Sequence, residues 1–268
     1  MRSARIFLAA FLFAASTLEP VAAQNKGSGK GSRSAPSQSQ EALEALGQVP
    51  VGLLPIYPAK VACPEVSSFF GSSVRYDGSA RVNDHYGFHN GIDITAPQGT
   101  PLLAVADGEV IHAGTAGMLV GNYVWLRHTP EDSALPVYLF TRYQHLDEPS
   151  PLSIGTRVKM GDVVARAGKT GTVGGYFGPA GYSHLHLLVF AADAPDFSIR
   201  EAVVFASVQR RYLDPLAIYA KPTDPFDNHT LMALPDELKR VAIPYQTKAG
   251  IREPADTKLI WPLACEPR

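Results

Sequence analysis

The chain has 268 residues, of which 46% are hydrophobic and 18% are charged, and its formal net charge is −1. This composition is typical of a globular protein and excludes a largely disordered chain. The lack of a basic excess argues against nucleic acid as a partner. The length suits one substantial domain with appendages, or two small domains.

The first residues have the pattern of a secretory signal peptide. Arg2 and Arg5 precede an apolar run over residues 6–15, and small residues follow at the end of the segment. Because the apolar run is too short to cross a membrane, we expect residues 1–23 to be removed on export. The mature protein is then periplasmic or secreted, without a membrane span. The alternative reading is a buried N-terminal helix.

A polar segment separates this leader from the folded part. Residues 24–40 contain one alanine and no larger aliphatic or aromatic residue, so they bury too little surface to offset the entropy of ordering. We expect a flexible linker over residues 24–48, with one or two helical turns over 41–46. The main domain is expected over residues 59–220.

The last segment, residues 221–268, contains seven prolines spaced along its length. We expect it to be an irregular extension packed on the domain, with a brief helix over 236–241. The chain has only two cysteines, Cys63 and Cys265. In an oxidising compartment such a pair predicts one disulfide that ties the extension to the start of the domain. Two unpaired buried thiols are the alternative.

Short β-strands dominate the predicted domain. A strand over 101–106 leads to Asp107-Gly108, a hairpin-type turn, and a second strand over 109–113. Residues 196–208 suit a short helix or a hairpin. The close spacing of these short strands along the chain predicts a mainly β, antiparallel fold. Further apolar segments suit strands at 122–128, 137–146 and 184–189, and residues 158–168 suit short strands on either side of a Gly-Asp turn.

Five residues have the types and spacing of a metal site with proton carriers. Side chains alternate along a strand, so His184 and His186 share one face. His89 and Asp93, four residues apart, also share a side in an extended segment. With one imidazole of the pair they make three protein ligands, the number typical of a catalytic zinc. The other imidazole, with His145 on another strand, is then free for proton transfer.

Three motifs resemble those of the lysostaphin/LytM-like zinc peptidoglycan endopeptidases. They are His89-x-x-x-Asp93, Tyr143-x-His145-Leu146 and His184-x-His186, in that order. The flanking stretches 91–101 and 104–110 are also similar to that family. The resemblance covers about residues 80–220 and implies an antiparallel β domain of the LytM/lysostaphin catalytic type.

The resemblance also implies roles for the five residues. His89, Asp93 and His186 would be the ligands of one zinc ion, whereas His145 and His184 would be the catalytic histidines. The implied reaction is hydrolysis of peptide bonds in peptidoglycan, in cross-links or stem peptides, by a metal-activated water.

Two alternatives use the same residues differently. An inactive domain of this fold would activate a partner hydrolase, although such domains lose site residues and all five are present here. A structural zinc would need a fourth protein ligand, for which His85 is the nearby candidate. The sequence does not identify a regulatory protein partner.

One loop departs from the family pattern. Residues 172–183, before the His184 strand, form a longer loop than is usual in the family. We expect this loop to lie at the substrate groove and to affect the choice of cross-link. The remaining histidines, which have no matching partners, are interpreted as structural or exposed: His112, His128 and His229.

Overall fold

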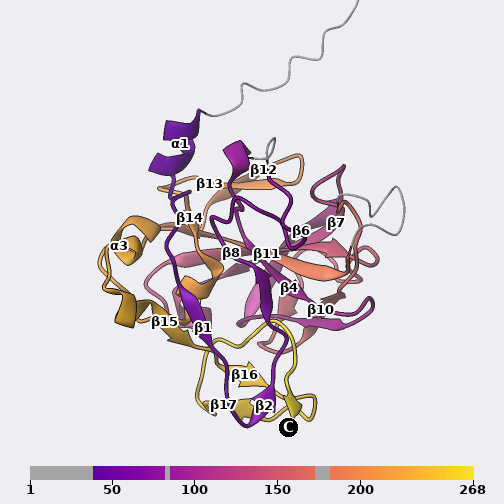
Figure 1. Cartoon of the computed structure of the whole chain (residues 1–268). Helices are drawn as coiled ribbons and strands as arrows, with labels where there is room; N and C mark the ends of the chain where they lie inside the picture. The colour runs from indigo at the N-terminus through magenta and orange to yellow at the C-terminus, as the bar shows by residue number, and fades with distance from the viewer. Residues whose placement is uncertain (1–38, 82–84, 173–181) are drawn as a thin grey trace, which may run out of the picture. The chain divides into compact units, whose positions relative to one another are not determined.

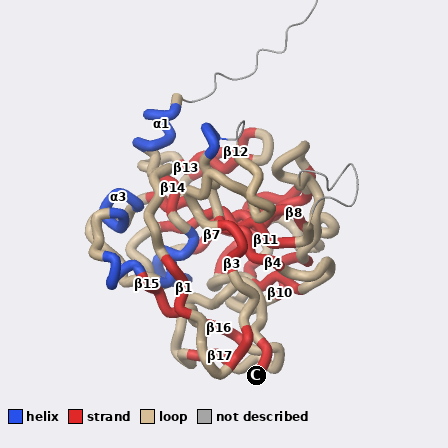
Figure 2. The backbone as a smooth tube through the Cα atoms, in the orientation of Figure 1, coloured by secondary structure: helices blue, strands red, loops and turns tan. Residues whose placement is uncertain are grey.

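Strand is the main regular secondary structure of the computed structural model, which describes residues 39–81, 85–172 and 182–268 (Figure 2), and nearly all of its strand pairs are antiparallel. The mainly β, antiparallel fold class is therefore confirmed. The predicted signal peptide and most of the 172–183 loop lie outside the described residues. In the described ranges, no helix has the length and apolar character needed to cross a membrane.

Helices in the described ranges are short; α1 precedes the first strand and the others lie between strands in the chain (Figure 1). The predicted turns over 41–46 correspond to α1. Of the brief helix predicted over 236–241, residues 236–239 form η3, a 3-10 helix, whereas 240 and 241 belong to a strand. The helical elements are α1 (Gln40–Ala45), η1 (His85–Gly87), α2 (Pro130–Ser133), η2 (Pro215–Tyr219), α3 (Asn228–Met232) and η3 (Asp236–Lys239). The strands are β1 (Leu54–Ile56), β2 (Val61–Ala62), β3 (Val66–Ser68), β4 (Ile92–Thr95), β5 (Pro101–Leu103), β6 (Gly108–Thr115), β7 (Asn122–His128), β8 (Tyr138–Leu146), β9 (Arg157–Val158), β10 (Val163–Arg166), β11 (His184–Ala192), β12 (Phe197–Arg200), β13 (Val203–Ala206), β14 (Arg211–Leu213), β15 (Arg240–Ala242), β16 (Tyr245–Gln246), β17 (Arg252–Glu253) and β18 (Glu266–Pro267).

The main sheet places the segments that carry the candidate residues side by side. Its strand order is β3-β4-β11-β8-β7-β6-β9, and β14 also pairs with β11. All of these pairs are antiparallel. In the register of β11, His186 lies opposite Asp93 of β4 and opposite Gln144 of β8. Hydrogen bonding between strands therefore sets which polar side chains meet.

The two central strands are buried along almost their whole length. Every residue of β11 is buried, and so is every residue of β8 after Tyr138. Leu185 and Leu187 alternate with the histidines and are 0% exposed. Their burial in the core fixes the opposite face for His184 and His186, because shifting a strand by one residue would turn every side chain to the wrong face.

The hairpin predicted at Asp107-Gly108 is wrong. β5 pairs with β10, whereas β6 pairs with β7 and β9. The Asp107 carboxylate accepts hydrogen bonds from the Met160 backbone N–H at 2.8 Å and from Lys159 Nζ at 2.8 Å. These contacts hold the chain where it passes from one sheet to the next, so the Asp-Gly pair does not reverse it. Over 196–208, the hairpin alternative is confirmed as β12–β13.

The C-terminal residues contact the beginning of the described chain. β18 pairs with β2, and Cys63 is joined to Cys265 by the predicted disulfide, which is confirmed. Trp261 is 0% exposed, and its Nε1 donates to the Pro64 carbonyl at 2.9 Å. Segments about 200 residues apart in sequence are thus linked by a strand pair, a covalent bond and a buried indole.

Candidate metal centre and active site

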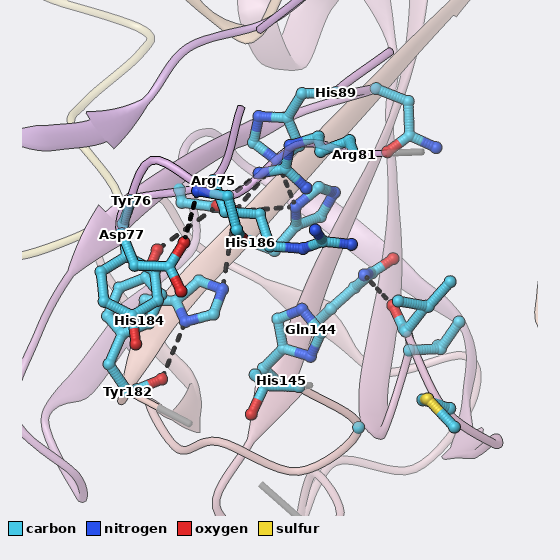
Figure 3. Close-up of a pocket in the computed structure, with 18 of the residues that line it drawn as sticks. Arg75, Tyr76, Asp77, Arg81, His89, Gln144, His145, Tyr182, His184 and His186 are labelled. Carbon is cyan, nitrogen blue, oxygen red and sulfur yellow. Dashed lines mark hydrogen bonds and ion pairs between the residues drawn. The ribbon is translucent and has the colours of Figure 1, made fainter. Parts of the chain in front are cut away.

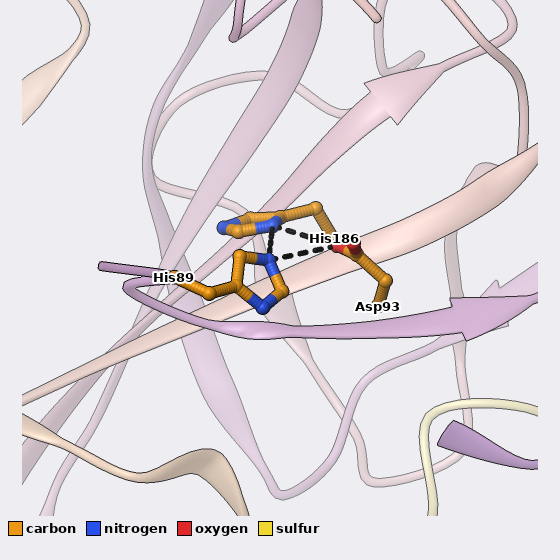
Figure 4. Close-up of side chains that lie close together, drawn as sticks. All are labelled: His89, Asp93 and His186. Carbon is orange, nitrogen blue, oxygen red and sulfur yellow. Dashed lines mark hydrogen bonds and ion pairs between the residues drawn. The ribbon is translucent and has the colours of Figure 1, made fainter. Parts of the chain in front are cut away.

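Three candidate ligands bring their donor atoms together in a triangle (Figure 4). His89 Nε2 lies 3.1 Å from Asp93 Oδ1, and His186 Nδ1 lies 2.9 Å from the same oxygen. The two imidazole nitrogens are 3.1 Å apart. All three side chains are buried. The group can therefore hold a metal ion within reach of two nitrogens and one oxygen.

The dimensions and chemistry of this triangle fit zinc. Donors at 2.0–2.2 Å from a tetrahedral zinc ion are about 3.3–3.6 Å apart, so the observed separations of 2.9–3.1 Å need to widen by about half an ångström to hold the ion. The His89 Nδ1–H donates to the Phe69 carbonyl at 2.9 Å, so His89 Nε2 presents a lone pair to its neighbours. Lone pairs on adjacent buried atoms repel one another unless a proton or a cation lies between them. A histidine, histidine and carboxylate set is a common zinc donor set.

Backbone packing positions this triangle. His186 and Asp93 face each other across β11 and β4, and His89 precedes β4 in the chain. The chain passes His186 closely at Gly91, where an added Cβ would lie 2.6 Å from His186 Nε2. A side chain at Gly91 would therefore displace a candidate ligand. The glycine of the His-Asn-Gly-Ile-Asp motif is required by this close approach.

His145 and His184 lie next to the triangle, and each has a fixed tautomer (Figure 3). Their ring centroids are 4.7 Å apart, and that of His145 is 5.8 Å from that of His186. The His145 Nδ1–H donates to the Thr170 carbonyl at 2.8 Å, and the His184 Nδ1–H donates to the Tyr182 carbonyl at 3.0 Å. In each neutral ring, Nε2 is therefore the nitrogen that can accept a proton.

The local backbone explains how His145 reaches this face. Alternation along β8 would turn His145 away from the side occupied by Gln144. However, His145 has φ of +60°, and the pairing register between β7 and β8 shifts between Asn122 and Tyr123. Consequently both Gln144 and His145 line the pocket. This irregularity is a tertiary feature that a period-two sequence pattern does not contain.

The charges of the site influence one another strongly. Burial raises the pKa of the Asp93 carboxyl, but the nearby His89 and His184 imidazoles and the short polar contacts with His186 and His89 outweigh it. The pKa of Asp93 is held well below its usual range, so the carboxyl is an anion. Burial lowers the pKa of His186 to about 3. The triangle is therefore an ionised carboxylate with a neutral His186.

The two adjacent histidines are also neutral near pH 7. Burial, and after it the charges of His184 and His186, lowers the pKa of His145 well below its usual value. Burial likewise lowers the pKa of His184. Neutral imidazoles whose Nδ1–H groups are already bonded can accept a proton at Nε2. The arrangement is suited to general-base chemistry beside a metal.

A pocket of about 430 Å³ contains all five candidate residues. Tyr182 stacks on His184 with ring centroids 4.2 Å apart, and it also contacts Tyr76. Met118 and Leu119 line another part of the wall and are partly exposed. The pocket thus combines polar groups at the triangle with aromatic and apolar walls, as expected of a site that binds part of a larger molecule.

Two lining residues were missed by the sequence analysis. Arg81 forms an ion pair with Asp93, and Gln144 donates through Nε2 to the Leu119 carbonyl at 3.3 Å. Within the described ranges, the buried Gln144 Oε1 has no hydrogen-bond partner. The only signal for Gln144 was its position next to His145. Arg81 lies outside the three motifs, so its role depends on the folded chain.

The other histidines have different surroundings. His128 is buried between the Asp107 carbonyl and the Thr141 hydroxyl, and His112 contacts the Tyr123 hydroxyl at 2.8 Å. His229 lies near the Glu44 carbonyl at 3.0 Å. These contacts agree with their interpretation as structural or exposed residues. The side chain of His85 and residues 173–181 of the loop lie outside what the structure describes.

The fold and the site define an antiparallel β domain with a His-Asp-His group that could hold a metal ion and two further histidines beside it. Residues 87–195 match the family described as peptidase family M23. The chain therefore contains a peptidase family M23 domain, which agrees with the resemblance seen in its motifs.

Individual relatives align with the same part of the chain. The peptidoglycan DD-endopeptidase ShyC of Vibrio cholerae is 37% identical over 98 residues, which are 37% of this chain and 19% of that protein. The murein hydrolase activator NlpD of Salmonella dublin is 30% identical over 105 residues, which are 38% of this chain and 26% of that protein. The chain thus spans about a fifth to a quarter of the length of these curated relatives.

One solved structure aligns with part of this chain. The catalytic domain of lysostaphin from Staphylococcus simulans is 24% identical, and the alignment covers 57% of this chain and 90% of that chain with a TM-score of 0.40.

Proposed function

We propose that this protein is a zinc-dependent endopeptidase that hydrolyses peptide bonds of bacterial peptidoglycan, in cross-links or stem peptides. The observation that carries the proposal is the donor triangle of His89, Asp93 and His186 beside two neutral histidines with fixed tautomers. The relative named as a peptidoglycan DD-endopeptidase supports the substrate class.

In this proposal the triangle holds one zinc ion. When bound, zinc supplies Lewis acidity, which activates a water molecule and polarises the scissile carbonyl. The ionised Asp93 carboxylate and the His89 Nε2 lone pair are ready to bind a cation without first losing a proton. Three protein ligands would leave the fourth coordination position open for water, as a catalytic zinc site needs.

His145 and His184 would handle the proton in this reaction. Each ring is oriented by its Nδ1–H bond to a backbone carbonyl, so Nε2 accepts a proton from water and later returns it to the leaving amine. The nearby Tyr182 ring stacks on His184 and restrains its orientation. Water attacks directly, so no covalent intermediate with the chain forms.

The experiment compares the wild type, His145→Ala and His112→Ala with cross-linked muropeptides, read by mass spectrometry, and records the zinc content of each protein. We expect the wild type to release smaller muropeptides, a chelator to stop it, and His145→Ala to keep zinc while losing activity. His112→Ala is the matched control and should cut normally. A wild-type protein that binds zinc and leaves every muropeptide intact would contradict the proposed activity. If the wild type does cut, the product masses identify the bond.

A second candidate is a domain that activates a partner cell-wall hydrolase. The relative named as a murein hydrolase activator favours it. Under this alternative the protein alone cuts nothing, yet it increases the release of muropeptides by a separate hydrolase. The His145→Ala variant separates the two functions, because an activator would keep its effect without this imidazole.

We also propose where the protein acts and how its chain is divided. The charged, apolar and small residues of 1–23 support export. A tether would follow them, but it would end before α1 and not at residue 48, because Leu43 is buried and the Leu46 carbonyl accepts a hydrogen bond from the Tyr212 N–H. The peptidase domain would cover 59–220, and 221–268 would be an extension packed on it. Mass spectrometry of protein recovered from the periplasm or culture medium would test this, because an intact Met1 there would contradict signal removal.

A further inference from the structure

The two oxygens of the Asp93 carboxylate have different partners. Oδ1 belongs to the donor triangle, with His89 Nε2 at 3.1 Å and His186 Nδ1 at 2.9 Å. Oδ2 points to other groups, with Arg81 Nη2 at 3.3 Å and the Tyr182 hydroxyl at 3.4 Å. A carboxylate can bind a metal through one oxygen or through both. Here the second oxygen is already engaged by a cation and a hydroxyl.

The same guanidinium nitrogen also reaches toward His89. Arg81 Nη2 donates to Ser68 Oγ at 3.1 Å, and Ser68 Oγ lies 3.3 Å from His89 Nδ1. In the sheet, Ser68 of β3 pairs with Asp93 of β4. One side chain therefore contacts one candidate ligand directly and a second through a serine, as in outer contacts that orient metal ligands.

Arg81 is held in place by its own segment of the chain. Its backbone N–H donates to the Ser73 carbonyl at 2.9 Å, and its Nε donates to the Val74 carbonyl at 3.3 Å. Val74 also forms an isolated bridge with Ala80. The side chain is only 10% exposed, and that of Asp93 is 6% exposed. The ion pair is thus buried and oriented, unlike the mobile surface pairs that contribute little.

We propose that Arg81 is a positioning residue that limits Asp93 to one-oxygen binding of the metal. By holding Oδ2, it leaves Oδ1 as the donor and keeps the coordination position that Oδ2 would take open for water and substrate. Through Ser68 it also restrains the His89 ring. This inference rests on the proposed zinc site and adds a residue outside the three motifs.

The test uses Co²⁺ in place of Zn²⁺, because the visible absorption of protein-bound Co²⁺ is strong in four-coordinate sites and weaker at higher coordination. The full protein is studied as wild type, Arg81→Gln, Arg81→Lys and Arg75→Gln. Arg75 lines the same pocket and bonds through Nη1 to the Ala80 carbonyl, so Arg75→Gln removes a nearby positive charge without removing the Asp93 contact.

We expect Arg81→Gln to lose Co²⁺ absorption intensity and to bind zinc about 10- to 100-fold more weakly in chelator competition. Arg81→Lys should recover part of the intensity, because it restores a cation beside Oδ2, and Arg75→Gln should match the wild type. Circular dichroism confirms that each variant is folded. If Arg81→Gln does not fold, Arg81→Lys decides the question, since the loss of the guanidinium fork should still reduce the intensity.

Several outcomes would overturn the inference. An Arg81→Gln spectrum equal to that of the wild type would do so, even if zinc affinity fell, because the coordination would be unchanged. Equal losses in Arg81→Gln and Arg75→Gln would point to general charge and would also overturn it. A wild type that binds neither ion would remove the zinc site and this inference together. In contrast, wild type that binds Co²⁺ but cuts no muropeptide would end only the proposed activity.

Discussion

The metal-site face of the sheet and the C-terminal segment 221–268 are held in place by different means. The candidate site residues lie on neighbouring strands, or just before one in the case of His89, and the register of these strands is fixed by backbone hydrogen bonds and by buried leucines on the opposite face. The C-terminal segment contains the short helices α3 and η3 and strands of two or three residues. Besides the short β1–β15 and β18–β2 pairs, it is joined to the rest of the chain by a disulfide and a buried tryptophan. Among the described residues that line the pocket, none belongs to 221–268.

From this difference we expect that substitutions can change the activity of this protein and the stability of its fold separately. Substitutions at the metal site should remove function with a small effect on folding, because the sheet does not depend on those side chains for its register. Substitutions in the C-terminal connection should destabilise the fold and leave the chemistry of folded molecules intact. The following predictions test this separation, beginning with the largest effect.

Removal of a proposed ligand should have the greatest effect on activity. We expect His89→Ala to lose zinc and to reduce muropeptide cleavage by about 10⁴-fold or more, because both the acidified water and the polarised carbonyl are lost. Its free energy of unfolding, compared with wild type without metal, should fall by no more than about 2 kcal/mol. Metal analysis, cleavage rates and urea titration measure these effects. If His89→Ala no longer unfolds cooperatively, the separation of chemistry from stability is wrong, because the site would then be essential to the fold.

His145→Ala should affect activity alone. It should keep one zinc ion per chain and reduce kcat by about 10²- to 10⁴-fold, the usual contribution of a positioned base. Loss of zinc from this variant would instead make His145 a ligand.

The disulfide should be important for stability and not for chemistry. Replacing Cys63 and Cys265 together by serine should lower the free energy of unfolding by about 2 to 5 kcal/mol, because the long loop it closes becomes free in the unfolded chain. Zinc content and the cleavage rate per folded molecule should match wild type. A fall in zinc content at temperatures where the variant is fully folded would show that the C-terminal segment does support the site.

His128 provides a pH-dependent test away from the metal. Burial lowers its pKa to about 4, and its ring is bonded in the neutral form to Asp107 and Thr141. In the unfolded chain, His128 takes up a proton near pH 6.5. The contribution of the neutral ring to the free energy of unfolding is therefore complete above that pH, and about 3 kcal/mol of it is lost between pH 6.5 and 4.

Urea unfolding of wild type and His128→Gln from pH 4 to 8 would measure this effect. The variant should show a shallower loss of stability toward pH 4, and the difference between the two proteins isolates His128 from other titrating groups. Parallel curves would contradict the prediction.

Local patterns in the sequence were sufficient to predict much of this structure. Alternation predicted the β11 strand and the shared face of His184 and His186, and the cysteine pair predicted the disulfide. The hairpin at Asp107-Gly108 failed because an Asp-Gly pair is compatible with a turn but does not specify which strand pairs with which. In the folded chain, the Asp107 carboxylate binds the 159–160 segment and the strands on its two sides enter different sheets.

The sequence by itself determined the mainly β class and the resemblance of its motifs to a peptidase family, and it supplied the five candidate site residues, because these depend on residue type and on short spacings. Only the tertiary structure decided that Asp93 faces His186 across a strand pair, that a register shift turns His145 into the pocket, and that Arg81 holds the second Asp93 oxygen. The first contact joins strands far apart in the chain, the second depends on one unusual backbone angle, and the third joins side chains 12 residues apart that no repeating pattern relates. Such features arise from pairing and packing, which no local pattern specifies.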